Sequence, residues 1–168
     1  WILEDNGICN RPGAITNLPA GKVFVLPKEG SANGRIVIDG SWEGEKLEKS
    51  ISILVEEGII TDVSGDEKAE AIWKQMEDIR SGLRPSKAAM VGNFAEFGFG
   101  MNPRAKIIGN SLEDLVSRGA IYFGFGNNMA LGGTVNVPLH IRGVCRKATV
   151  ALEDVDLLVE GKVTAKVR

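Results

Sequence analysis

The stretches VGNFAEFGFG (residues 91–100) and IYFGFGNN (residues 121–128) are candidate strands rich in glycine and aromatic residues. Glycine occurs 21 times in the 168 residues and falls within or between short β-rich runs. Because glycine allows bends and bulges in a strand, these stretches predict a strongly curved, barrel-like sheet. Neither stretch has the glycine spacing of a phosphate-binding loop that opens a helix after a strand.

Short β-rich runs separated by turn signals extend over most of the chain. Turn signals such as EGSANG (29–34), SGD (64–66) and EG (160–161) separate the runs, and this spacing favours an antiparallel or mixed sheet. Glu160-Gly161 is expected at the turn of a C-terminal hairpin. The predicted strands cover residues 22–26, 35–39, 51–55, 58–63, 88–99, 120–125, 138–144, 148–152 and 156–167.

Two helices are predicted between the strands. Ser64 followed by Glu67 three residues later forms a capping box, and Gly82 is placed to end this first helix. A short second helix is expected to be capped by Ser111 and to end at Gly119. The first helix has an apolar face made of Ala69, Ile72, Trp73, Met76 and Ile79. The sequence therefore predicts an α+β fold, with residues 1–168 forming a single domain.

Composition excludes several classes of protein. The net charge is −2, with acidic and basic residues mixed along the chain, which argues against a nucleic-acid-binding protein. No apolar run approaches the roughly 20 residues that cross a bilayer. Cys9 and Cys145 lack metal-ligand spacing, so we expect two idle thiols in a cytoplasmic protein. The chain begins with Trp1, which predicts a piece of a longer protein whose N-terminal part is missing.

Two side chains are candidates for chemistry. His140, in NVPLHIRG (residues 136–143), is the only histidine, and it is interpreted as either a metal ligand or a satisfied core histidine. Glu96 is an acid in an otherwise apolar strand, where burial is costly without a partner. A site role and a salt bridge both remain open for Glu96. No nucleophile motif of the GxSxG type is present.

Four motifs in order carry a resemblance to a known family. The chain resembles the catalytic C-terminal domain of the thermophilic metallo-aminopeptidases, namely aminopeptidase T and its leucyl aminopeptidase relatives. This resemblance implies a two-domain hydrolase whose C-terminal half is a cradle-like barrel that holds metals and forms a homodimer. Residues 1–168 would be that half. The motifs are GICNRPGAITNLPAGKVFVLPKEGSANGRIVIDGS (7–41), AEFGFGMNP (95–103), LEDLVSRGAIYFGFGNNMALGG (112–133) and NVPLHIRG (136–143).

The resemblance implies a set of metal-site positions that is only partly retained. In the family, carboxylates and histidines hold two divalent metals that activate a water molecule. Glu96 and His140 stand at ligand positions and keep the ligand residue type. Lys22 replaces a glutamate, Tyr122 a histidine and Arg142 an aspartate. Met129 stands at the position of a family tyrosine that assists the chemistry.

These replacements change the charge of the site. Lys22 and Arg142 put positive charges where carboxylates held cations, and like charges about 4 Å apart repel by roughly 4 kcal/mol at an effective dielectric of 20. Glu96 can instead pair with Arg142 or Lys22. We therefore expect no cofactor, a vestigial His140 hydrogen-bonded inside a polar cluster, and a non-catalytic or altered-function protein. Lys22, Tyr122, His140 and Arg142 could bind a small anion.

Two enzymatic alternatives stay open, so the sequence does not decide whether the protein is an enzyme. An active aminopeptidase would need zinc or cobalt ligands from nearby acids, for which Asp39, Glu43 and Asp114 are candidates. The scaffold also resembles a branch that uses one iron in ring-opening dioxygenases of dihydroxypyridines. In that alternative, Glu96, His140 and a third group would hold the metal.

Overall fold

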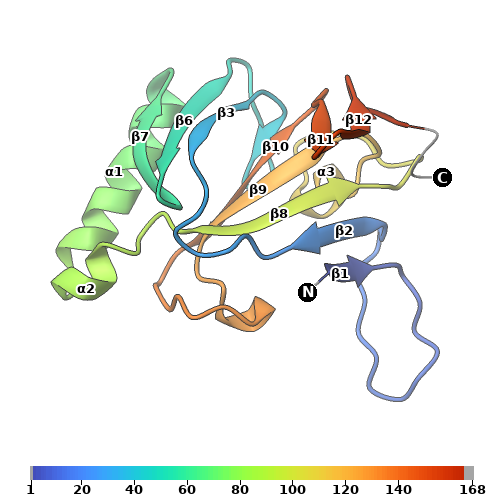
Figure 1. Ribbon diagram of the computed structural model, residues 1–168, viewed down its shortest axis with the longest axis horizontal. Coiled ribbons are helices and arrows are strands. Elements are labelled where there is room, and N and C mark those ends of the chain that lie inside the picture. Colours follow the sequence, from blue (N-terminus) through green and yellow to red (C-terminus); the bar gives the residue numbers. More distant parts are fainter. Residues whose placement is uncertain (1, 165–168) are drawn as a thin grey trace.

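The computed structural model describes residues 2–164 and contains three antiparallel sheets (Figure 1). The largest sheet has seven strands in the order β1-β2-β8-β9-β10-β4-β5. Its strands are β1 (Ile2–Asp5), β2 (Lys22–Val25), β8 (Phe94–Gly100), β9 (Ile121–Gly126), β10 (His140–Cys145), β4 (Ser41–Trp42) and β5 (Glu45–Lys46). The two smaller sheets consist of β3 (Gly34–Ile38), β6 (Ile51–Glu56) and β7 (Ile59–Ser64), and of β11 (Val150–Leu152), β12 (Val155–Val159) and β13 (Lys162–Val163).

The expected α+β class is confirmed, but the barrel is not. The seven-stranded sheet is open, with β1 at one edge and β5 at the other. Gly98 and Gly124, which were expected to bend the strands, do not adopt positive φ angles. The predicted bulge is present, because the register of β8 and β9 shifts between Phe94 and Glu96, next to Gly124, but the sheet does not close into a barrel.

The glycines of β8 and β9 make room for side chains on one face of the sheet. On the other face, Phe97, Phe99, Phe123 and Phe125 belong to or pack against the main apolar core. A Cβ atom at Gly98 would lie 2.3 Å from Cζ of Tyr122, and one at Gly124 would lie 2.9 Å from Cβ of Glu96. Because phenylalanine and glycine alternate, the phenylalanine side chains lie on the face that packs on the core. The glycines lie on the opposite face, where they leave space for Glu96 and Tyr122.

The long helix α1 (Glu67–Ser81) packs on the small sheet β3-β6-β7 (Figure 1). Ala69, Ile72 and Met76 are its buried residues, in agreement with the predicted apolar face, and Gly82 follows its last residue as predicted. The predicted cap at Ser64 is wrong, because Ser64 ends β7 and the side chain of Asp66 accepts a hydrogen bond from Lys68 N instead.

The short helices differ from the prediction. α3 (Ser111–Asp114) has only four residues and is capped by Asn110 rather than Ser111. An additional helix, α2 (Pro85–Ala88), and a 3-10 turn, η1 (Met129–Leu131), were not predicted. α2 begins at a proline, which favours the first turn of a helix, and it delays the start of the predicted strand 88–99 to Phe94.

Glu-Gly turns join successive strands of the sheets. Glu57-Gly58 connects β6 to β7, and Glu160-Gly161 connects β12 to β13 as predicted. In each turn both residues have positive φ, 47° and 75° for Glu160 and Gly161, which matches the twist of a hairpin. The strand predicted over 156–167 ends within the described residues at Val163, and its last three residues, 165–167, lie outside them.

One carboxylate ties the loop between β9 and β10 to the loop after β2. Glu29 accepts hydrogen bonds from the backbone N–H and the hydroxyl of Thr134, at 2.8 and 2.6 Å, and from the side-chain amide of Asn128 at 2.8 Å. These donors lower the pKa of Glu29. The loop that contains η1 is therefore fastened over the large sheet by a charge-assisted cluster.

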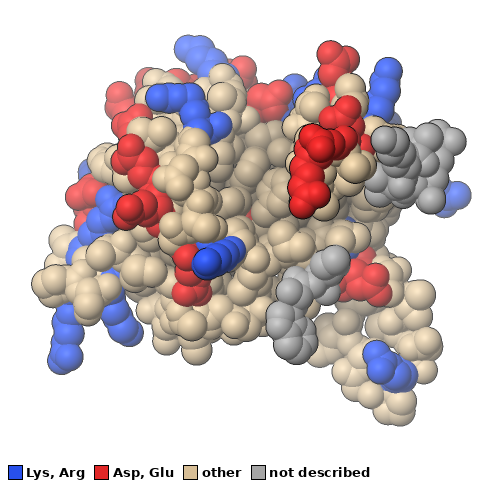
Figure 2. Space-filling view, in the orientation of Figure 1, with Lys and Arg blue, Asp and Glu red and all other residues tan. Residues whose placement is uncertain are grey.

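The surface and the thiols agree with the composition. Acidic and basic side chains are interspersed over the face shown in Figure 2. Cys9 and Cys145 are both free, and burial raises the pKa of Cys145 to about 12. Among the described residues, no helix combines the length and apolar character needed to span a membrane.

The substitution Gly98→Ala is expected to destabilise the protein by about 1–3 kcal/mol, because the added methyl group must displace the Tyr122 ring. Gly82→Ala is the matched control, since its added Cβ would meet nothing closer than 3.7 Å. Urea unfolding of both variants measures the difference. Equal stability of the two variants would contradict the role assigned to Gly98.

The substitution Glu29→Ala is expected to cost about 1–3 kcal/mol at pH 7, because it removes an acceptor shared by three donors. The folded-state pKa of Glu29 is lowered, so its contribution is present above the unfolded value of about 4.3 and is lost as the pH falls through the folded value. Urea unfolding at pH 7 and at acidic pH should show the difference shrinking. Glu48→Ala, at an exposed position, serves as the control.

Candidate functional site

The predicted site residues lie on adjacent strands of the large sheet. Gly124 of β9 pairs with Glu96 of β8 on one side and with Arg142 of β10 on the other. Neighbouring strands are about 4.8 Å apart, so the two long side chains face each other across a residue that has no side chain. Register and glycine together bring the acid and the base into contact.

Glu96 is fully buried, and both of its carboxylate oxygens are hydrogen-bonded. The Tyr122 hydroxyl donates to Oε1 at 2.7 Å, and Nε of Arg142 donates to Oε2 at 2.9 Å. The expected ion pair between Glu96 and Arg142 is therefore present. Burial, followed by the charge of Glu96, raises the pKa of Tyr122 far above its usual value, so its hydroxyl remains a donor.

Glu96, Tyr122 and Arg142 form a hydrogen-bonded polar cluster. Lys22 lies beside this cluster but makes no hydrogen bond to it. Its Nζ atom lies 5.1 Å from the centre of the Phe24 ring and 5.8 Å from that of Tyr122, and within residues 2–164 it has no ion-pair partner. Burial lowers the pKa of Lys22, and the charge of Glu96 partly opposes this shift. Of the two bases expected to pair with Glu96, only Arg142 does so.

His140 is hydrogen-bonded to the backbone rather than to the polar cluster. Its Nδ1 lies 2.7 Å from the carbonyl oxygen of Asn127, which can only accept, so Nδ1 carries the hydrogen. Nε2 is buried without a hydrogen-bond partner among the described residues and lies 3.7 Å from Oε2 of Glu96. In the neutral ring, Nε2 therefore presents a free lone pair toward the cluster.

The other predicted positions lie apart from the cluster. Met129 is exposed on η1. Asp39 accepts from Arg146 N at 2.8 Å, Glu43 accepts from Arg142 N, and Asp114 accepts from backbone N–H groups at 2.8 and 3.2 Å. Among the described residues, none of these acids joins Glu96 and His140 in a group that could hold a metal ion.

The donor set does not fit a resident divalent metal. In the described part of the chain, no three His, Cys, Asp or Glu side chains converge. An ion about 2.1 Å from Oε2 of Glu96 would lie at most about 5 Å from Nε of Arg142, where the two charges repel by roughly 7 kcal/mol at a dielectric of 20. Non-haem iron sites use two histidines and a carboxylate, whereas this cluster has one of each.

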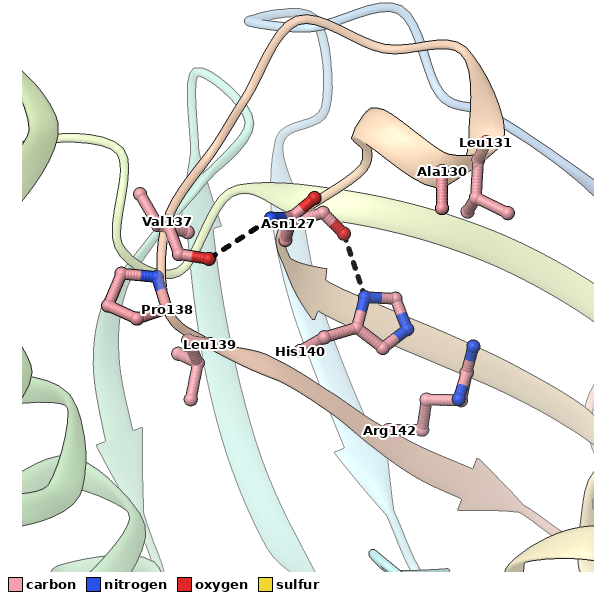
Figure 3. A pocket seen from close by; sticks show the side chains of 8 residues that line it. All are labelled: Asn127, Ala130, Leu131, Val137, Pro138, Leu139, His140 and Arg142. Carbon is pink, nitrogen blue, oxygen red and sulfur yellow. Dashed lines mark hydrogen bonds between the residues drawn. The ribbon is translucent and has the colours of Figure 1, made fainter.

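A pocket of about 480 Å³ opens beside His140 and Arg142 (Figure 3). Both side chains project from β10 into it, and η1 contributes the opposite wall. An amide hydrogen bond of 3.2 Å from Asn127 to the carbonyl of Val137 spans the loop. The apolar lining consists of Ala130, Leu131, Val137, Pro138 and Leu139.

The sequence did not reveal this apolar lining. The run NVPL directly before His140 gave no distinct signal, because Val137 and Leu139 also fit a strand that faces the core, which is where they lie. The partners of Glu29 were equally hidden, since Glu29 and Thr134 lie 105 residues apart.

Comparisons with known proteins identify the family. The model of the NicX family, described as 2,5-dihydroxypyridine 5,6-dioxygenase, matches residues 1–165. The 2,5-dihydroxypyridine 5,6-dioxygenase of Pseudomonas putida KT2440 is 26% identical over an alignment of 179 positions, and the match covers 97% of this chain and 48% of that protein. The chain thus spans about half the length of this curated relative.

A solved structure shares the fold. The structure of the 2,5-dihydroxypyridine dioxygenase from Pseudomonas putida KT2440 matches with a TM-score of 0.75 and 24% identity. The match covers 87% of this chain and 44% of that chain. At this identity the likeness supports the fold alone.

These findings correct the sequence-based family assignment. The predicted membership among the metallo-aminopeptidases is wrong, and with it the hydrolase class, because the family model that matches residues 1–165 and the curated relative both describe dioxygenases. The alternative resemblance, to ring-opening dioxygenases of dihydroxypyridines, is the one that the match supports. The chain belongs to the 2,5-dihydroxypyridine 5,6-dioxygenase family.

Proposed function

We propose that the protein binds a small hydroxylated pyridine ring in the pocket beside His140 and Arg142. The observation that carries this proposal is that the unpaired amino groups of Arg142 lie beside apolar pocket walls. Pockets of 300–1,000 Å³ with apolar walls and a few convergent polar groups are typical of small-molecule sites. This pocket, at about 480 Å³, lies within that range.

The unpaired amino groups of Arg142, at one end of the pocket, support recognition of ring oxygens. The terminal amino groups of Arg142 have no hydrogen-bond partner among the described residues, since only Nε is used by Glu96. They can donate to an electron-rich or anionic ring oxygen. Nε2 of His140 is itself buried, so His140 contributes the edge of its ring to the pocket wall and the ring oxygens are left to Arg142.

The apolar lining supports a flat, uncharged ring body. Leu131, Val137 and Leu139 line the pocket and offer apolar contacts to the ring. The relative's name states 2,5-dihydroxypyridine, whose ring oxygens suit the unpaired amino groups of Arg142.

Ring-opening dioxygenation is a second candidate function, favoured by the family match over residues 1–165. That activity, stated in the relative's name, would make the protein an oxidoreductase. The resemblance to iron-dependent dioxygenases implies an iron, and the cluster around Glu96 does not supply its ligands. Ring binding is therefore the function that these residues support best.

Binding of 2,5-dihydroxypyridine is expected by isothermal titration calorimetry, with pyridine at least about tenfold weaker because it lacks both oxygens. Ala130→Trp should abolish binding by filling the pocket from its exposed rim. Ala71→Trp, on the exposed side of α1, is the matched control. Equal affinity of the two tryptophan variants would contradict the proposal.

Arg142→Lys is expected to weaken binding of 2,5-dihydroxypyridine by about tenfold or more, since lysine keeps the charge but loses the planar set of donors. The same calorimetry measures it, with Arg84→Gln at an exposed position as the control. Oxygen uptake with the ring and added Fe²⁺, lost in His140→Ala, would favour dioxygenation over binding alone.

A further inference from the structure

We propose that the guanidinium group of Arg142 takes the place of a metal ion in this site, so that the site is built around a resident organic cation. This inference does not depend on which ligand the pocket takes. It assigns Arg142 two roles: it neutralises the buried Glu96, and it presents donors to the pocket.

The first support is that Arg142 occupies the oxygen atom of Glu96 that a metal ion would need. Oε2 of Glu96 accepts from Nε of Arg142 at 2.9 Å and lies 3.7 Å from Nε2 of His140. These two atoms, Oε2 and Nε2, are spaced closely enough for one ion to contact both. An ion bound there would have to displace the guanidinium group, and it would leave that charged group without its partner.

The surrounding charges are the second support. Lys22 adds a positive charge next to the Tyr122 ring, and Tyr122 already donates its hydrogen to Oε1 of Glu96. Within the described chain, Glu96 is the sole fully buried carboxylate in contact with this cluster. Asp5, which pairs with Lys22 across β1 and β2, is the second carboxylate whose charge acts on Lys22. The negative charges of Glu96 and Asp5 thus balance the positive charges of Lys22 and Arg142, which leaves none to balance a divalent ion.

The position of Gly124 between Glu96 and Arg142 is the third support. Gly124 leaves room for Glu96 and Arg142 to meet above β9, since a Cβ atom there would lie 3.3 Å from Oε2. The space between β8 and β10 is therefore already used by the ion pair. The remaining donors of Arg142 point to the pocket that it lines together with His140.

A titration with Co²⁺, followed by its visible absorption, tests this inference. The wild-type protein is expected to show no saturable binding that depends on Glu96. In Arg142→Asp, a carboxylate two residues after His140 replaces the cation and lies on the same face of β10. This variant is expected to bind Co²⁺ at least about 100-fold more tightly, because even indirect partners of a metal change its affinity by 10–100-fold.

Two further variants keep the test decisive. Arg142→His supplies a neutral ligand and serves if Arg142→Asp does not fold. The double variant Arg142→Asp/His140→Ala is the matched control and should lose the gained binding. The inference is overturned if wild-type protein binds one equivalent of Co²⁺ and Glu96→Gln abolishes it. It is also overturned if the folded Arg142 variants gain no binding.

Discussion

The carboxylate of Glu96 has no exposed surface, and the organisation of the site follows from the need to pair it. An isolated buried carboxylate is strongly unfavourable, so each oxygen requires a donor. Arg142 and Tyr122 provide these donors from two neighbouring strands. Removing one partner of such a pair typically costs several kcal/mol, although Arg142 is partly exposed and its share is correspondingly smaller. The pair therefore sets the charge of the site, and it forms only in the strand register that places Gly124 between Glu96 and Arg142.

The glycines of β8 and β9 are the structural condition for this pairing. Gly98 accommodates the Tyr122 ring and Gly124 accommodates Glu96, while the intervening phenylalanines fill the core on the opposite face. The glycine pattern that predicts a curved sheet in the sequence thus also makes room for polar side chains on one face of the sheet. The loop after β9 covers the end of this space and is held there by Glu29. Pocket, polar cluster and loop are consequences of one arrangement of strands.

Local patterns predicted much of the secondary structure. The strands that begin near residues 22, 35, 51, 59, 121 and 140 lie where apolar runs bounded by turn signals were found, and α1 has its predicted apolar face. Errors arose where two local signals competed. Ser64 was available as a helix cap, but pairing with Ser52 of β6 keeps it in β7, and Asp66 caps the helix. The family was misassigned because short motifs of a shared scaffold do not separate its branches, whereas the match over residues 1–165 does.

The sequence by itself determined the residue types of the site. It showed that Lys22 and Arg142 occur with Glu96, Tyr122 and a single histidine, and it therefore predicted a charge balance that disfavours divalent cations. Only the tertiary structure decided that Arg142 rather than Lys22 pairs with Glu96, because that choice depends on the register across Gly124. It also decided that His140 bonds to the Asn127 carbonyl and faces an apolar pocket. Residue type is encoded locally, whereas distances between side chains far apart in the chain are set by strand pairing and packing.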